Sequence, residues 1–293
     1  MRQLIVEKSS IKNGLIQLEG KDFRYLRQVL RVRPGDMISV RLPDGSLNNA
    51  TVAQIDENAR RVVLQICADT SGFGESDKSI TRGVQADEIS GDGRNGAVET
   101  EYWLFQFLPR PQKFEMIVRQ ATECGVSVIV PVVGEYTEKS SVQSLLGAKR
   151  ERLQKIIREA RQQSGSPVDT KVLDPMSLEQ AIEQWNPVGE CPRSGCIETT
   201  VAFVLSERGD CDGNLRSTVQ KAGDKPIKRA AIAVGSEGGI SPEEVKLLEE
   251  KGLFVPVHFA VNILRCETAA LYGIAAVQCE VNESKRLSGQ ARQ

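Results

Sequence analysis

Three segments that combine charged residues with small ones follow short apolar runs of the kind that form buried strands. They are Ser206–Gly209, Gly235–Glu244 and Asn262–Ala270. In parallel α/β sheets, ligands bind beyond the carboxyl ends of the strands. The three segments therefore predict a ligand site at the strand ends of such a sheet.

The second segment has the composition of a loop whose backbone can lie close to a ligand. Three glycines within five residues, Gly235, Gly238 and Gly239, allow positive φ angles and bring the backbone close to a flat ligand. Ser241 and Pro242 then resemble a helix cap. Glycine-rich turns between a strand and a helix are often structural, and this spacing fits neither GxGxxG nor a P-loop. The loop by itself therefore leaves the ligand undefined.

The third segment places charge directly before an alanine-rich helix. Small residues at a helix start allow tight packing against a backbone or a flat ring. Arg265 and Glu267 could form a structural ion pair, or Arg265 could meet an anionic or polar ligand. Both interpretations stay open at this point.

The region from Tyr102 onward alternates strands and helices, which predicts a parallel sheet covered on both faces. The periodicity predicts helices at 112–123, 144–163, 178–185, 242–251 and 267–280. Strands are expected at 102–108, 126–133, 170–173, 200–206, 230–234 and 254–259. Two stretches, 186–198 and 209–226, read as surface excursions.

Residues 1–67 predict a different unit, a small β-barrel of about five short strands with one helix at Asp22–Arg31. This unit carries 11 basic and 7 acidic side chains. Arg24, Arg27 and Arg31 follow i, i+3, i+7 spacing, which would place them on one helix face. We interpret them as a phosphate-contacting surface, the alternative being a solvated face.

Composition excludes several classes of protein. No apolar run approaches the ~20 residues of a membrane span, and the N-terminus does not resemble a signal peptide. Seven cysteines without paired spacing indicate reduced thiols, hence a cytoplasmic protein. With one histidine, His258, we expect no metal site, and Cys191, Cys196 and Cys211 are interpreted as surface thiols.

The stretch 68–101 is acidic and glycine-rich, with 3 basic and 8 acidic side chains. Because it has few large apolar residues, we expect a flexible insertion or linker. The predicted organisation is thus residues 1–67 as a small β-barrel domain with a phosphate-contacting surface, 68–101 as a linker, 102–285 as an α/β domain and 286–293 as a tail.

The combination of motifs resembles the RsmE family, the 16S rRNA (uridine-N3) methyltransferases of the SPOUT superfamily. The resemblance rests on Gly-Ser-Glu-Gly-Gly at 235–239 and Ile-Leu-Arg-Cys-Glu-Thr-Ala at 263–269. The stretches 25–36 and 113–126 look like the family's PUA-like domain and its first catalytic-domain helix. The insertion 68–101 and the two later excursions fall outside it.

The resemblance implies a PUA-like N-terminal barrel and a C-terminal parallel sheet with a trefoil knot. It also implies an S-adenosylmethionine-dependent homodimer that methylates ribosomal RNA in the small subunit. The resemblance gives cofactor-binding roles to Leu205, Gly235, Gly239, Ile263, Leu264 and Thr268, and Arg265, Glu267 and Thr268 would shape the loop and the base pocket. Arg265 is the expected catalytic residue, with Glu237 as the carboxylate candidate for orienting the reactants. The RNA contacts expected of Arg24, Arg27 and Arg31 rest on their charge and spacing. Arg265 would stabilise the uridine anion, because arginine stays protonated and cannot serve as the base.

Four positions depart from the family pattern, and one of them is Tyr25, which stands where the family often has histidine. Ser236 stands where the family commonly has proline, and Phe259-Ala260 stand where it commonly has Leu-Gly. If position 260 required a positive φ angle, alanine there would cost roughly 1 kcal/mol or more. Ser236, Phe259 and Ala260 are the features that favour one alternative, an RNA-binding homologue without catalysis. A second alternative is a methyltransferase acting on another RNA position.

Overall fold

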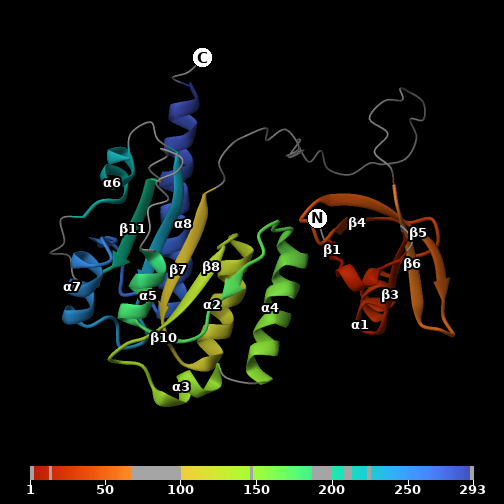
Figure 1. Cartoon of the computed structure of the whole chain (residues 1–293), viewed down its shortest axis with the longest axis horizontal. Helices are drawn as coiled ribbons and strands as arrows, with labels where there is room; N and C mark the ends of the chain where they lie inside the picture. Colours follow the sequence, from red (N-terminus) through yellow and green to blue (C-terminus); the bar gives the residue numbers. More distant parts are fainter. Residues whose placement is uncertain are drawn as a thin grey trace. The chain divides into compact units, whose positions relative to one another are not determined.

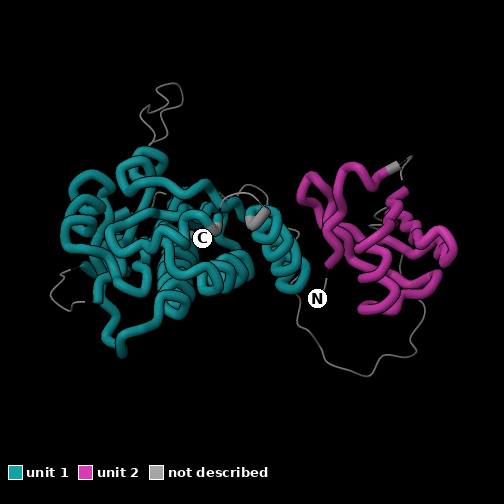
Figure 2. Tube along the Cα trace, turned by 90° about the horizontal axis from the view of Figure 1, so that it is seen from below, with its two compact units in different colours: residues 1–2, 99–293 teal, residues 3–98 magenta. Residues whose placement is uncertain are grey.

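A computed structural model describes residues 3–12, 15–67, 100–145, 148–186, 199–207, 213–222 and 226–290 (Figure 1). The chain divides into two compact units, residues 3–98 and residues 99–293 with the first two residues (Figure 2). Of the predicted linker 68–101, residues 68–99 lie outside the described residues.

The first unit is built on one six-stranded sheet, in the order β1-β4-β5-β6-β3-β2. The strands are β1 (Leu4–Ile5), β2 (Ile11–Lys12), β3 (Leu15–Glu19), β4 (Met37–Arg41), β5 (Leu47–Asp56) and β6 (Arg61–Ile66). A short 3-10 helix, η1 (Lys8–Ser10), precedes β2. The sheet forms a half-barrel around buried side chains such as Ile16, Val40 and Leu64, and the β-rich class predicted for this unit is confirmed.

The helix of the first unit differs in geometry from the expected single α-helix. It begins as α1 (Gly20–Arg24) and continues as a π-helical segment, η2 (Tyr25–Leu30). Arg31 follows in the left-handed conformation, with φ 55°. The wider π turn and this left-handed cap break the 3.6-residue periodicity, so the i, i+3, i+7 spacing no longer defines one helix face.

The second unit contains a wholly parallel sheet in the order β10-β8-β7-β12-β11-β13, with β9 also paired to β8. The strands are β7 (Glu101–Phe107), β8 (Val128–Val133), β9 (Lys171–Val172), β10 (Met176–Ser177), β11 (Thr199–Leu205), β12 (Ile227–Val234) and β13 (Val255–Val257). This confirms the parallel sheet predicted from the alternation of strands and helices. The trefoil knot stays a prediction.

Helices cover both faces of this sheet. They are α2 (Pro111–Glu123), α3 (Lys139–Ser144), α4 (Ala148–Ser164), α5 (Leu178–Trp185), α6 (Leu215–Lys221), α7 (Pro242–Glu250) and α8 (Cys266–Gln290). One core cluster joins α2, α4, α6 and α8 to alternate strand residues such as Ile232. The other core cluster joins α5 and α7 to the strand residues between these, such as Ala233. The two clusters use alternate residues because successive side chains of a strand point to opposite faces of the sheet.

Three helices differ from their predicted bounds. The helix expected at 144–163 is α4, which begins at Ala148 and ends at Ser164, whereas Ser144 is the last residue of a separate helix, α3. The excursion 209–226 contains α6, whose buried Val219 joins the core. Helix α8 continues ten residues beyond the predicted end at Glu280, through the predicted tail to Gln290, because Val281 is fully buried.

No helix in the described part of the chain is long and apolar enough to cross a membrane.

Candidate functional site

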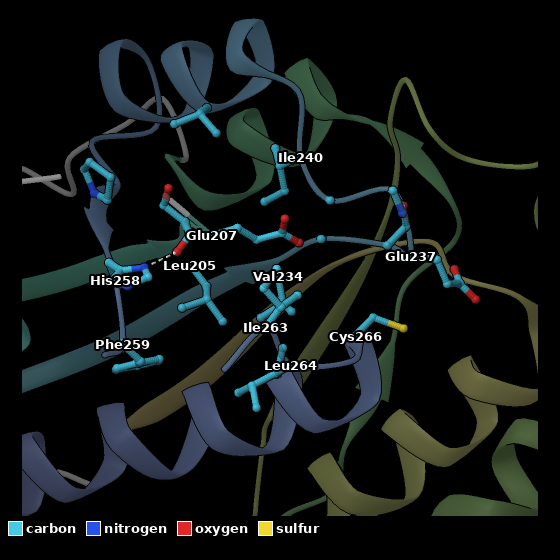
Figure 3. A pocket seen from close by; sticks show the side chains of 18 of the residues that line it. Leu205, Glu207, Val234, Glu237, Ile240, His258, Phe259, Ile263, Leu264 and Cys266 are labelled. Atoms are coloured by element: carbon cyan, nitrogen blue, oxygen red, sulfur yellow. Dashed lines mark hydrogen bonds between the residues drawn. The ribbon is translucent and has the colours of Figure 1, made fainter. Parts of the chain in front are cut away.

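A cavity of about 990 Å³ lies at the carboxyl ends of three neighbouring strands, β12, β11 and β13. Its walls come mainly from three segments, 205–207 after β11, 234–240 after β12 and 258–266 after β13 (Figure 3). These strands are parallel, so their ends meet at one edge of the sheet. The three strand ends singled out in the sequence therefore converge on one cavity.

Most predicted site residues line this cavity. Those that do are Leu205, Gly235, Glu237, Gly239, Ile263, Leu264 and Arg265. Thr268 does not line it; this residue is exposed on α8, and the helical residue that does reach the cavity is Ala269. The structure thus brings the loop residues together around one cavity and places Thr268 outside its lining.

The glycine-rich loop is tight because its backbone folds on itself. A Cβ atom on Gly235 would lie 2.7 Å from the carbonyl carbon of Gly239, whose own φ is +79°. Ser236 is buried; its hydroxyl accepts a hydrogen bond from the Gly238 N–H at 3.3 Å and its carbonyl accepts one from the Gly239 N–H at 3.1 Å. Serine at this position therefore supports the turn through hydrogen bonds.

The loop is anchored by the start of α7, where the predicted cap is a full capping box. The Ser241 hydroxyl accepts from the Glu244 N–H at 3.4 Å, and the Glu244 carboxylate accepts from the Ser241 N–H at 2.9 Å. The other oxygen of Glu244 accepts from the Glu135 N–H at 2.7 Å. One carboxylate thus ties the cap to the segment after β8, where Tyr136 packs against Gly238.

A lysine that the sequence reasoning gave no role links two walls of the cavity. Lys113, in the first turn of α2, lies 3.4 Å from the Glu237 carboxylate and 3.5 Å from the Glu267 carboxylate. The Arg110 N–H also donates to Glu237, at 3.3 Å to each oxygen. A cation in the first helical turn opposes the helix dipole, so its two carboxylate partners explain why it is stable there.

Ionisation in this cluster follows from burial and neighbouring charge. Burial works against the charge of Lys113, but its interactions with the neighbouring Cys266, Glu237 and Glu267 outweigh that effect and raise its pKa. Burial and a hydrogen bond to the Glu267 carboxylate raise the pKa of the Cys266 thiol to about 12. The thiol therefore stays protonated at neutral pH.

The pKa of Glu267 moves the other way. Burial would raise it, but a backbone hydrogen bond, the Cys266 thiol and the Lys113 charge together lower it. Glu267 therefore pairs with Lys113, and no ion pair joins it to Arg265 among the described residues. The side chain of Arg265 is exposed at the cavity without a described ion-pair partner, which removes the structural-bridge alternative for this residue.

The loop after β13 carries the departures at Phe259 and Ala260. Ala260 is not among the residues with positive φ, so the strain considered for alanine there does not arise. Phe259 forms an edge-to-face pair with Tyr272, with ring centroids 5.0 Å apart. Nδ1 of His258 lies 3.2 Å from the Ser206 carbonyl oxygen, an interaction that links the ends of β13 and β11.

The arginines predicted to contact RNA have different surroundings in the first unit. Arg27 donates to the Val32 carbonyl at 2.7 Å and pairs with Glu57 at 2.5 Å. Arg24 and Arg31 are exposed. Of the three, Arg27 thus has a structural role in holding the end of the helix, and Arg24 and Arg31 remain the accessible charges.

No group of histidine, cysteine or acidic residues in the described ranges could hold a metal ion. Cys191, Cys196 and Cys211 lie outside those ranges.

The fold and the site together define a class: a two-unit α/β protein whose cavity is built from loops at the strand ends. The model of the RNA methyltransferase domain family matches residues 98–278, and the chain belongs to this family. The match covers the whole cavity. It confirms the methyltransferase class that the sequence motifs indicated.

Relatives extend the likeness over both units. The chain is 26% identical to ribosomal RNA small subunit methyltransferase E of Bacillus subtilis, covering 72% of this chain and 80% of the relative. It is 25% identical to methyltransferase E 2 of Borreliella burgdorferi, covering 94% and 96%. The resemblance to the RsmE family is confirmed by these matches.

A solved structure has the same fold. Ribosomal RNA small subunit methyltransferase E of Neisseria gonorrhoeae, solved bound to S-adenosyl methionine, superposes with a TM-score of 0.66 at 22% identity. The superposition covers 95% of this chain and 97% of that one. The two-unit fold class is confirmed.

Proposed function

We propose that this protein transfers a methyl group from S-adenosylmethionine to N3 of a uridine in 16S ribosomal RNA. The observation that carries the proposal is the convergence of three strand-end loops on one cavity, with the Arg265 side chain exposed at it and free of Glu267. The relatives' names supply the small ribosomal subunit as substrate.

The cavity suits a nucleoside cofactor in size and lining. Its volume of about 990 Å³ lies at the upper end of the range for small-molecule sites. Leu205, Ile240 and Leu264 provide apolar walls, and the backbone of the glycine-rich loop provides polar groups at close range. When bound, S-adenosylmethionine supplies an activated methyl group on its sulfonium.

The protein's own contribution is positioning and electrostatics. Methylation at N3 requires loss of the N3 proton, which leaves negative charge on the uracil ring. The guanidinium of Arg265 stabilises that charge with fixed donors. Glu237 is held by Lys113 and the Arg110 N–H, so it is a positioning residue for the loop.

The first unit supplies charge for RNA. The exposed Arg24 and Arg31 contact phosphates and steer the RNA, whereas Arg27 is engaged by Glu57 and the Val32 carbonyl. The protein acts as a homodimer in the cytoplasm, where ribosomes are assembled. These assignments rest on the resemblance and on the exposed arginines.

The proposal is tested by incubating the protein with tritiated S-adenosylmethionine and either 16S rRNA, 30S particles or 23S rRNA. Tritium should enter the small-subunit substrates and leave 23S rRNA unlabelled. A protein that binds both RNA and cofactor without transferring the label would be the non-catalytic homologue.

A further inference from the structure

One carboxylate in the cavity has no role in the site described so far. Glu207 lies two residues past the end of β11 and lines the cavity together with Leu205. No hydrogen bond or ion pair joins its carboxylate to another described residue. In contrast, Glu237, which also lines the cavity, and Glu267 at the start of α8 are both engaged by Lys113.

The Glu207 carboxylate lies directly beside the glycine-rich loop. Its Oε1 atom is 3.5 Å and its Oε2 atom 4.0 Å from the place where a Cβ on Gly239 would stand. Only a glycine leaves this space open for a ligand to approach both the carboxylate and the loop backbone. Figure 3 shows Glu207 between Ile240 and Val234.

The position of Glu207 along the cavity indicates which part of a ligand it would meet. His258 and Phe259 lie toward one end, and Glu237 and Cys266 lie toward the other (Figure 3). The aromatic and apolar end suits the adenine base, and the end with Lys113 and Glu237 suits the charged amino-acid part. The ribose connects these two parts, so it falls in the middle, beside Glu207.

We propose that Glu207 accepts hydrogen bonds from the 2′- and 3′-hydroxyl groups of the cofactor ribose. A carboxylate offers two acceptor oxygens at a fixed separation, which matches two neighbouring O–H donors. The proposal rests on the proposed function, since it assigns a residue to the ribose of the same cofactor. It makes Glu207 a binding residue that selects a ribonucleoside.

The test removes the proposed hydrogen bonds in two ways, by changing the ligand and by changing Glu207. S-adenosylhomocysteine and an analogue without both ribose hydroxyls are titrated by calorimetry into the wild-type protein, Glu207→Ala and Glu207→Gln. Glu183→Gln, an exposed change on α5 outside the cavity lining, is the matched control. Thermal melts verify that each variant folds.

The wild-type protein and Glu183→Gln should bind the analogue about 10- to 100-fold more weakly than S-adenosylhomocysteine, the range for hydrogen bonds to a charged group. Glu207→Ala should bind both ligands with nearly equal affinity. Glu207→Gln should fall between, because its amide keeps one acceptor.

Two results would overturn the inference. One is an unchanged ratio between the two ligands in Glu207→Ala, which would mean that Glu207 meets another group or none. The other is a wild-type protein that binds both ligands equally. A wild-type protein that binds neither ligand would contradict the proposed function itself, a distinguishable outcome that also removes the inference.

Discussion

Replacement of Lys113 by methionine should loosen the cavity by separating two of its walls. Methionine keeps most of the length and apolar stem of lysine but removes the charge that holds Glu237 and Glu267 at 3.4 and 3.5 Å. Without this cation, the two carboxylates have no counter-charge between them. The two ion pairs that join the loop 235–239 and the start of α8 to α2 are then lost.

The size of the effect follows from the exposure of the three side chains, which is 28% for Lys113, 33% for Glu237 and 13% for Glu267. Fully exposed pairs contribute about 0.2–1 kcal/mol, and breaking a buried pair costs about 3–5 kcal/mol. This partly buried cluster lies between those limits. We therefore expect a loss of about 1–3 kcal/mol in the free energy of unfolding.

The displaced loop should also bind the cofactor less tightly. We expect the binding free energy of Lys113→Met to weaken by about 1.4 kcal/mol, which corresponds to a tenfold lower affinity. Calorimetric titration with S-adenosylhomocysteine and denaturant unfolding measure the two effects. Lys155→Met is the control, because Lys155 is 65% exposed and its one ion pair among the described residues is with Glu159 on the same helix. This change should cost about 0.5 kcal/mol or less. A Lys113→Met protein as stable as this control, with unchanged affinity, would refute the reasoning.

Three further predictions concern single residues. Arg265→Lys keeps the charge but loses the planar fork, so turnover in the methyl-transfer assay should fall by ~10²-fold or more while cofactor binding persists; normal turnover would remove its catalytic role. Gly213→Ala should lower the free energy of unfolding by about 1–3 kcal/mol or prevent folding, because its Cβ would stand 1.8 Å from the Pro256 carbonyl oxygen; a wild-type melting curve would contradict this. The pKa of Glu267 is lowered in the folded protein, so its ionised form stabilises the fold at pH values above the ordinary value near 4.5, and this contribution is lost as the pH falls through the folded-state pKa. Glu267→Gln should therefore lower the free energy of unfolding at pH 7 and lower it much less near pH 3. An equal decrease at both pH values would count against the pairing with Lys113.

Local signals in the sequence predicted the parts of the site that depend on neighbouring residues. The cap at Ser241 and Pro242 and the helix at 178–185 follow from short-range patterns. The three strand ends follow from apolar runs that stop at glycine or charge. The general rule for parallel sheets then placed them at one edge.

Other features depend on contacts that no local pattern encodes. Lys113 meets residues more than 100 positions away, so only the folded chain shows its role. The π-helical segment at 25–30 carries the same residue types as an α-helix, and helix α6 has too few apolar residues to give a periodic signal. Thr268 was carried over with the motif, but the helix places it outside the cavity lining.

The central claim is tested most directly by locating the transferred methyl group. After reaction of 30S particles with the protein and S-adenosylmethionine, 16S rRNA is digested to nucleosides and analysed by liquid chromatography and mass spectrometry against methyluridine standards. The proposed function predicts N3-methyluridine as the product, in amounts that Arg265→Lys strongly reduces. A methyl group on the ribose 2′-oxygen, on another base atom, or on no nucleoside at all would contradict it.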